Sequence, residues 1–187
     1  MSSLPSPSEI VGFWRAAGYD RWFSSDPAFD AEVRARLLPA HEDAVARGAG
    51  SIMLTDYEDS AEGALALVLL LDQVPRNAFR GTPRAFATDA AARQVADRAL
   101  GRGFEHAFEP QLRAFFFLPL MHAEDLACQE RCVALYEKLG QTEELKYAVL
   151  HRDVIARFGR FPHRNPILGR PMTVEEEAYL ASGGFKG

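Results

Sequence analysis

The chain has little cysteine and little lysine. Its two cysteines, Cys128 and Cys132, stand four residues apart in a segment with helical periodicity. Side chains at this spacing share one helix face while their backbone vectors run nearly parallel, which disfavours a disulfide. A cysteine-based zinc site would need more ligands, and the chain has no other cysteine. We therefore expect two reduced, buried thiols.

Long hydrophobic runs are also absent. The longest apolar stretches, Ala64–Leu71 and Ala114–Met121, are far too short to span a bilayer. The first residues, MSSLPSPSE, lack the positive start and the apolar centre of a signal peptide. The sequence therefore predicts a soluble, cytoplasmic protein with no membrane partner.

Basic residues are fewer than acidic ones, and the net charge is −5. Nucleic acids and anionic membranes are bound through basic surface, so we expect no nucleic-acid partner. A chain of 187 residues with 48% hydrophobic content can bury a substantial core. We expect one domain over residues 1–187, and nothing in the sequence selects an oligomeric state.

Strand signals are missing, because no segment alternates polar and apolar residues for long and no Asn-Gly hairpin is present. Helix signals recur instead. Ser6-Pro7-Ser8-Glu9 and Thr173-Val174-Glu175-Glu176 both have the pattern of a capping box, and Gly140 and Gly159 follow helical runs as terminators. The sequence predicts an all-α protein of about eight helices in antiparallel pairs, a tetratricopeptide-like helical stack.

The predicted helices have defined starting points. The segment from Asp59 to Leu71 is apolar nearly all round, which predicts a central helix followed by a turn over residues 73–81. Pro39 is expected to kink or break the helix predicted to begin at Asp26-Pro27. Pro119 is expected to end the helix predicted to begin at Glu109-Pro110. The other expected starts are Pro7, Asp26-Pro27, Thr82-Pro83, Glu109-Pro110, His122, Thr142 and Thr173.

Positive charge is concentrated in HRDVIARFGRFPHRNPILGR, residues 151–170. This stretch carries +4 with neutral histidines, while the other 167 residues together carry −9. Its glycines and prolines predict a rigid, irregular loop after residue 158. Arginines there could hold a phosphate or carboxylate bidentately, or could equally bind helix carbonyls and pair with Asp72 and Glu124. The candidates in this loop are Arg160, His163, Arg164, Asn165 and Arg170.

A second candidate set surrounds Asp72, which continues the apolar stripe at the last turn of the predicted central helix. A carboxylate there is disfavoured by burial and by the negative end of the helix dipole. It should persist only with cationic or donor partners, either as a buried ion pair that locks the turn or as part of a binding site. Nearby donors are Arg76, Asn77 and Arg80.

Three histidines are candidates for acid–base chemistry. His151 lies on the apolar face of the helix predicted over residues 142–158, where a lone histidine is usually a hydrogen-bonded core residue. His163 follows in the loop, and His122 lies next to Glu124 on the turn or face of another helix; these groups could meet if the helices pack together. HExxH, GxSxG, P-loop and dinucleotide-binding motifs are all missing, so we expect no metal and no cofactor.

Three segments carry a family resemblance: DQVPRNAFRGTPRAFATDA (72–90), FLPLMHAEDLACQ (117–129) and HRDVIARFGRFPHRNPILGR (151–170). Together they resemble the bacterial DUF924 family, and the likeness extends over about residues 9–181. The resemblance implies an all-helical, tetratricopeptide-like fold without an established biochemical function. Ala123 stands where this family usually has serine, so a serine nucleophile beside His122 is not expected.

Three functional interpretations remain open from the sequence. The first is a polar pocket that binds a small anion or an acidic peptide end. The second is an enzyme that uses a histidine of the same pocket as acid and base on an anionic substrate. The third is a buried polar network that only fixes how the helices meet. The residues proposed to line the pocket are Asp72, Arg76, Asn77, Arg80, His122, Glu124, His151, Arg160, His163, Arg164, Asn165 and Arg170.

Overall fold

The computed structural model describes residues 4–186 and is all-α, as predicted: its regular elements over this range are helices, with one isolated bridge between Ala49 and Ile52. Met1–Ser3, on which the expectation of no leader segment partly rests, lie outside the described residues. No helix in the described range is long and apolar enough to cross a membrane.

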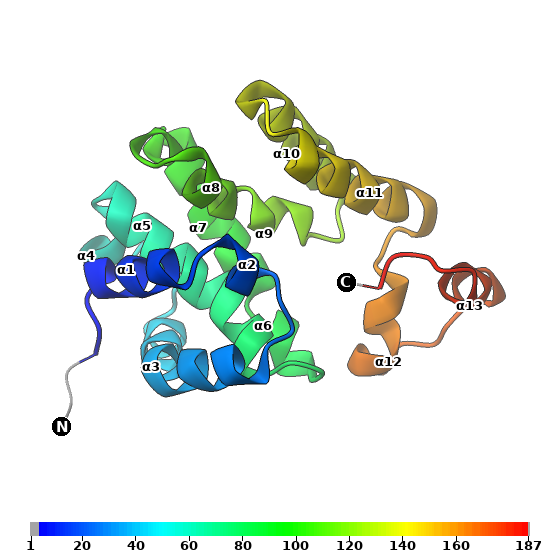
Figure 1. Cartoon of the computed structure of the whole chain (residues 1–187), viewed down its shortest axis with the longest axis horizontal. Coiled ribbons are helices and arrows are strands. Elements are labelled where there is room, and N and C mark those ends of the chain that lie inside the picture. Colours follow the sequence, from blue (N-terminus) through cyan, green and yellow to red (C-terminus); the bar gives the residue numbers. More distant parts are fainter. Residues whose placement is uncertain (1–3, 187) are drawn as a thin grey trace. The chain divides into compact units, whose positions relative to one another are not determined.

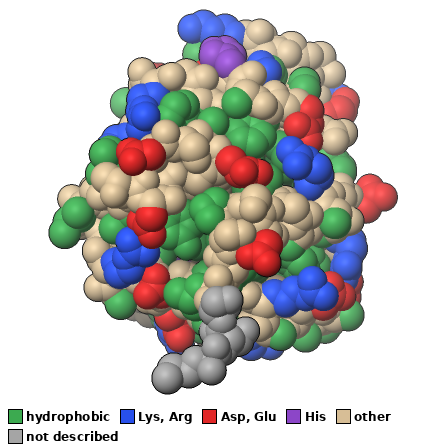
Figure 2. All heavy atoms as spheres, turned by 90° about the vertical axis from the view of Figure 1, so that its left-hand side faces the viewer, with side chains coloured by type: hydrophobic (Ala, Val, Ile, Leu, Met, Phe, Trp, Pro, Cys, Tyr) green, Lys and Arg blue, Asp and Glu red, His purple; other side chains and the backbone are tan. Residues whose placement is uncertain are grey.

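The contacts divide the chain into two compact units. Unit 1 comprises residues up to 80 together with 84–119, and unit 2 comprises 81–83 and the residues from 120 onward. The expectation of one domain over residues 1–187 stays a prediction. Figure 2 shows one face of the molecule, on which acidic and basic side chains are interspersed among exposed hydrophobic ones.

The helices of unit 1 run from α1 to the first part of α9 (Figure 1). Their bounds are α1 Pro7–Ala17, α2 Tyr19–Trp22, α3 Pro27–Ala46, α4 Thr55–Glu58, α5 Ala61–Val68, the π-helical turn η1 Leu69–Gln73, α6 Val74–Ala78, α7 Asp89–Gly101, α8 Pro110–Arg113 and α9 Leu118–Met121. Short 3-10 turns lie at Pro83–Phe86, Phe104–Ala107 and Ala114–Phe116. In unit 2 follow α10 Leu126–Leu139, α11 Thr142–Phe158, the 3-10 turn η5 Pro162–Arg164, α12 Asn165–Leu168 and α13 Val174–Ala181.

The predicted caps form as expected. Ser6 and Thr173 each accept a hydrogen bond from the backbone N–H three residues on, and Glu9 and Glu176 bond back to complete two capping boxes. Gly140 and Gly159 adopt the left-handed conformation that ends α10 and α11. The local chemistry of single residues therefore sets several helix ends.

The segment predicted to be central is the core of unit 1. Residues 64–71 are almost completely buried, and α5 packs against α1, α4 and α7. Side chains that are apolar on every face need neighbours on every side, which explains this position. Gly63 lets α4 approach closely, since a Cβ at this position would lie 1.9 Å from the Tyr57 carbonyl oxygen.

The turn predicted over residues 73–81 forms only at its end, over residues 79–81, and the prediction is wrong for residues 73–78. The helix continues instead through the π-helical turn η1 into α6, so residues 61–78 form one helical segment with Pro75 inside it. A π-helical turn lengthens the repeat and leaves carbonyl groups without their usual partners. Proline also removes one donor, and side chains donate hydrogen bonds to the carbonyls around the turn.

Two other prolines, Pro39 and Pro119, do not end a helix as predicted. Pro39 lies inside α3, which continues for 20 residues rather than breaking, and Pro119 lies inside α9 rather than ending a helix. The alanine-rich helix does not begin at Thr82-Pro83: a 3-10 turn comes first, and α7 begins at Asp89. Proline fits the first turn of a helix, so a proline alone does not decide whether the following helix is long or short.

Unit 2 is built on α10 and α11, which pack side by side as a hairpin (Figure 1). The helix predicted from His122 begins only after Asp125, whose side chain accepts a hydrogen bond from the Cys128 N–H. The loop predicted after residue 158 is also only partly irregular, because it forms η5 and α12. Pro162 and Pro166 stand at the first positions of these two turns, where proline favours a helical start.

Candidate functional site

The predicted site residues fall into both units. Asp72, Arg76, Asn77 and Arg80 belong to unit 1, and the other eight belong to unit 2. Each group is described on its own. Among residues 4–186, no three histidine, cysteine, aspartate or glutamate side chains are grouped in a way that could hold a metal ion.

In unit 1 the polar residues hold the π-helical turn together. Four consecutive carbonyls accept side-chain hydrogen bonds: Leu70 from His41 Nδ1 at 2.8 Å, Leu71 from Thr88 Oγ1 at 2.5 Å, Asp72 from Arg76 Nη1 at 2.7 Å and Gln73 from Asn77 Nδ2 at 2.9 Å. All four carbonyls belong to the stretch in which the π-helical turn passes into the helix that contains Pro75. Asn77, proposed as a ligand-binding residue, thus serves the backbone of its own helix.

The charges around this turn are paired. Asp72 is fully buried and lies 3.1 Å from Arg76 Nη1, and Arg76 also forms a bidentate pair with Asp89 at 2.8 and 3.1 Å. Arg80 pairs bidentately with Asp30 on α3 at 2.8 Å for both bonds. The expectation that Asp72 needs a cationic partner is met by Arg76, four residues further along the same helical segment.

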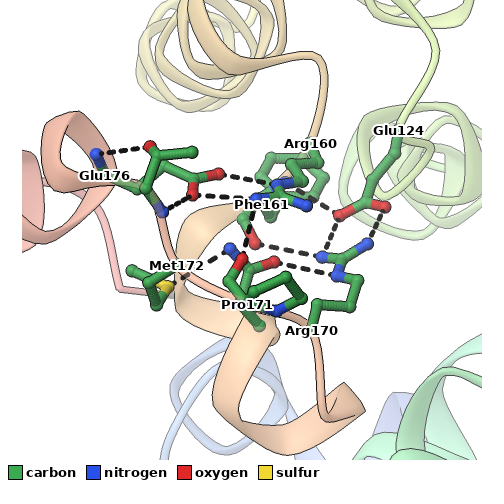
Figure 3. A network of polar contacts seen from close by, with 9 residues as sticks. Glu124, Arg160, Phe161, Arg170, Pro171, Met172 and Glu176 are labelled. Carbon is green, nitrogen blue, oxygen red and sulfur yellow. Dashed lines mark hydrogen bonds and ion pairs between the residues drawn. The ribbon is translucent and has the colours of Figure 1, made fainter.

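In unit 2, four charged residues form what we call the arginine–glutamate network: Glu124, Arg160, Arg170 and Glu176. Arg170 holds both oxygens of Glu124 at 2.6 and 2.8 Å, and Arg160 holds both oxygens of Glu176 at 2.6 and 2.9 Å (Figure 3). The Phe161 N–H also donates to Glu124 at 2.8 Å. Each carboxylate therefore meets a guanidinium fork.

Further contacts tie this network to the backbone (Figure 3). Arg170 Nε donates to the side-chain oxygen of the fully buried Asn165 at 2.8 Å, and Arg160 donates to the Pro171 carbonyl at 3.0 Å. The amide of Asn165 also donates to the Met172 sulfur at 3.2 Å. The network thus fixes the path from η5 through α12 to α13.

The protonation of the two glutamates follows from these bonds. Burial alone would raise the pKa of Glu124, but hydrogen bonds from Arg170 and from the Phe161 N–H outweigh it and lower the pKa. The Arg160 guanidinium and the Thr173 cap lower the pKa of Glu176 to about 2. Both side chains are therefore charged at neutral pH, and they neutralise two of the arginines proposed to bind an anion.

The remaining candidates form a second group, here called the histidine cluster: His122, His151, His163 and Arg164. Burial, together with the positive charge of Arg164, lowers the pKa of His163 to about 4. Burial also lowers the pKa of His151 to about 3, with further lowering from His122, Arg164 and His163. At neutral pH these two imidazoles are uncharged.

The tautomer of His151 is fixed by its surroundings. Its Nδ1 lies 2.7 Å from the Tyr147 carbonyl oxygen one turn earlier in α11. A carbonyl can only accept a hydrogen bond, so Nδ1 must carry the proton, and the neutral ring then has its lone pair on Nε2. His151 is thus oriented as a proton acceptor at Nε2.

His163 lacks a hydrogen bond of the kind that His151 makes through Nδ1. Its Nδ1 is buried, and among residues 4–186 it has no hydrogen-bond partner. Leaving a buried polar atom without a partner costs about 1–3 kcal/mol in general, and such atoms are uncommon in folded proteins. The imidazole lies beside two phenyl rings, with its centroid 5.6 Å from that of Phe161 and 5.3 Å from that of Phe185.

Two phenyl rings lie against the cluster, and neither was among the site residues predicted from the sequence. Phe185 packs with its ring centroid 4.4 Å from that of His151, and the Arg164 guanidinium carbon lies 4.5 Å above the Phe161 ring. The closeness of Phe161 to the loop arginines is visible in the sequence. Phe185 gives no such signal, because it stands beyond the last predicted helix among glycines.

Three comparisons place the chain among known proteins. A family model described as "Bacterial protein of unknown function (DUF924)" matches residues 10–184. A solved structure of a protein of unknown function from Agrobacterium tumefaciens is similar over 95% of this chain and 97% of that one, with 48% sequence identity and a TM-score of 0.87. A search of the curated proteins found no match.

Proposed function

Because the chain belongs to the DUF924 family of bacterial proteins of unknown function, we propose its function from its own side chains: the histidine cluster binds the oxygen group of a small anion together with a proton. The observation that carries this proposal is the buried Nδ1 of His163, which has no partner within the described residues. A carboxylate or phosphate oxygen would supply one.

Charge supports an anion rather than a neutral ligand. The positive charge of Arg164 acts on both His151 and His163, as their lowered pKa values indicate. An anion in contact with these groups would be attracted by the guanidinium and would stabilise a protonated imidazole. The four arginines 76, 80, 160 and 170 are weaker candidates, because carboxylates already occupy their donors.

Proton uptake follows from the same argument. In the free protein the pKa of His163 is about 4, so the ring is neutral at pH 7. A bound anion raises this pKa, and between the two pKa values the complex holds one proton more than the free protein. Linkage then requires the affinity to increase as the pH falls, by at most about tenfold per pH unit for one coupled proton.

The test is a pair of calorimetric titrations, with acetate and with inorganic phosphate, repeated at several values between pH 7 and pH 5. We expect tighter binding at lower pH, and loss of this pH dependence in His163→Gln. His106→Gln is the matched control, because the side chain of His106 is 72% exposed and lies outside the cluster. Binding that is independent of pH, or that is equal in both variants, would contradict the proposal. The two anions distinguish a carboxylate ligand from a phosphate ligand.

A second candidate function is acid–base catalysis by His151. The observation that favours it is the fixed tautomer, which leaves the Nε2 lone pair as the proton acceptor. Hydrolysis of p-nitrophenyl acetate is a suitable probe reaction. A kcat/KM that falls at least about tenfold in His151→Gln but not in His106→Gln would support this role, and equal rates would exclude it for this ester.

A further inference from the structure

We infer that the anion bound by the histidine cluster is an aromatic carboxylate, and that its ring takes the place that Phe185 occupies in the free protein. This inference rests on the proposed anion-binding function and gives the ligand a chemical class. It also assigns a role to the segment 183–186, which then acts as a displaceable cover of the site.

The Phe185 ring lies among three other rings. Its centroid lies 4.4 Å from the His151 ring, 5.3 Å from the His163 ring and 6.3 Å from the Phe161 ring. The interplanar angles are 59°, 85° and 60°, which are tilted or edge-to-face arrangements favoured between aromatic rings. Three ring-bearing side chains thus surround a space that a phenyl group fills.

Two backbone hydrogen bonds to one residue hold the segment 183–186 in place. Tyr179 on α13 provides both attachments: its carbonyl accepts a hydrogen bond from the Gly184 N–H, and its hydroxyl accepts one from the Phe185 N–H, each at 2.9 Å. Gly184 passes so close to Tyr179 that a Cβ at this position would lie 2.5 Å from the tyrosine ring. The segment therefore docks through two backbone bonds and one phenyl ring.

The Phe185 ring can leave its place without disturbing the helices. Segments beyond the last helix open at low free-energy cost, because few buried contacts must be broken. Phe185 packs on the small cluster of Val154, Ile155 and Phe161 rather than inside a helix pair. Displacing its ring therefore leaves the helices of unit 2 in place.

An aromatic carboxylate can form one hydrogen bond that the Phe185 ring cannot form. The phenyl ring of Phe185 provides ring contacts to His151 and His163 but no acceptor for the unpartnered Nδ1 of His163. An aromatic carboxylate of similar size provides the same ring contacts and adds an oxygen beside His163. A ligand of this class thus replaces every contact of the covering side chain and gains one hydrogen bond.

The experiment measures the affinities of benzoate, acetate and benzamide at pH 6 for the whole protein and for Phe185→Ala. We expect Phe185→Ala to bind benzoate about tenfold more tightly than the unmodified chain, since the ring no longer has to be displaced. Acetate should change less than about twofold, because it does not use the ring position. Benzamide, which lacks the charge, should bind more weakly than benzoate in both proteins.

Two further variants keep the test decisive. Phe185→Leu fills the same space without an aromatic ring and should bind benzoate like the unmodified chain. Tyr179→Phe removes only the hydroxyl that accepts the Phe185 N–H, so it loosens the segment and should improve benzoate binding in the same direction by a smaller factor. If Phe185→Ala does not fold, Tyr179→Phe still decides the question.

NMR spectroscopy shows where the ligand binds. Bound benzoate should shift the imidazole proton resonances of His151 and His163 in the NMR spectrum and leave those of His106 unchanged. If Phe185→Ala binds benzoate no better than acetate, while both remain proton-coupled, the aromatic ligand class is wrong and the anion site stands. If neither anion binds and the pKa of His163 does not move, the proposed function fails as well.

Discussion

The arginine–glutamate network and the histidine cluster both lie in unit 2, and both draw on the stretch from residue 151 to 170. They differ in how completely their polar groups are satisfied. In the network each carboxylate meets a guanidinium at 2.6 Å, and each arginine also donates to a backbone carbonyl or to Asn165. In the cluster the two buried imidazoles are uncharged, and Nδ1 of His163 has no partner among the described residues.

This difference distinguishes residues that stabilise the fold from residues that can bind a ligand. A guanidinium that already holds a carboxylate bidentately has few donors left for a ligand, so the charged half of the stretch fixes the backbone. A buried nitrogen without a partner is a cost to the fold that a ligand can remove. We therefore interpret the network as the support that positions η5 and α12, and the cluster as the site that they present.

The largest expected effect on stability comes from a substitution that breaks the arginine–glutamate network. Glu124→Gln leaves the Arg170 guanidinium without its counter-charge in a partly buried position, and we expect the free energy of unfolding to fall by about 2–4 kcal/mol. Glu175→Gln is the matched control, because the Arg157–Glu175 pair is more than half exposed and should matter by less than about 0.5 kcal/mol. Urea unfolding measures both. Similar values for the two variants would show that Glu124 is not part of a supporting network.

The pH dependence of stability distinguishes the two regions. Histidines with lowered pKa values bind fewer protons in the folded than in the unfolded chain. Stability is therefore lost as the pH falls from 6.5 toward about 4 for His163 and about 3 for His151, by at most about 1.4 kcal/mol per pH unit for each ring. The carboxylates act at lower pH: the contribution of Glu176 is present above 4.5 and is lost as the pH falls toward about 2.

Unfolding measured between pH 7 and pH 5 checks this separation. His163→Gln should reduce the slope of stability against pH in this range relative to the unmodified chain, and Glu124→Gln should leave the slope unchanged. The difference between variants is the relevant quantity, because burial also lowers the pKa of His41 in unit 1. A slope that His163→Gln does not alter would show that this imidazole is not held neutral by the fold.

The smallest expected effect concerns an arginine of the same stretch that belongs to neither region. Arg152 pairs with its neighbour Asp153, whose side chain is 60% exposed. We expect Arg152→Ala to change stability by less than about 0.5 kcal/mol and to leave acetate and benzoate affinities unchanged. Loss of anion binding in this variant would mean that the general positive charge of the stretch, rather than the cluster, attracts the ligand.

Several helix ends could be predicted because they depend on local chemistry. Ser6, Thr173, Gly140 and Gly159 each act within four residues of their own position, so their spacing in the sequence was sufficient. The π-helical turn at Leu69–Gln73 could not be predicted in this way. It depends on His41 and Thr88, which lie far from it in the sequence and supply the hydrogen bonds that the turn needs.

The site was predictable only in part, for the same reason. The sequence singled out the charged stretch, but whether an arginine is free or paired depends on contacts made over long separations. Arg170 meets Glu124 across 46 residues, and Arg160 meets Glu176, whose capping role was its only visible signal. His151 was found by its position on an apolar face and His163 by its place in the charged loop, whereas the contribution of Phe185 follows only from the fold.

The most direct test of the account is an NMR titration of the His163 imidazole between pH 3 and pH 8, with and without benzoate. The account predicts a pKa of about 4 in the free protein, and a pKa raised toward the ordinary value of 6.5 when benzoate is bound. A free pKa near 6.5 that benzoate does not change would contradict it, since the ring would then be neither buried without a partner nor in contact with the anion.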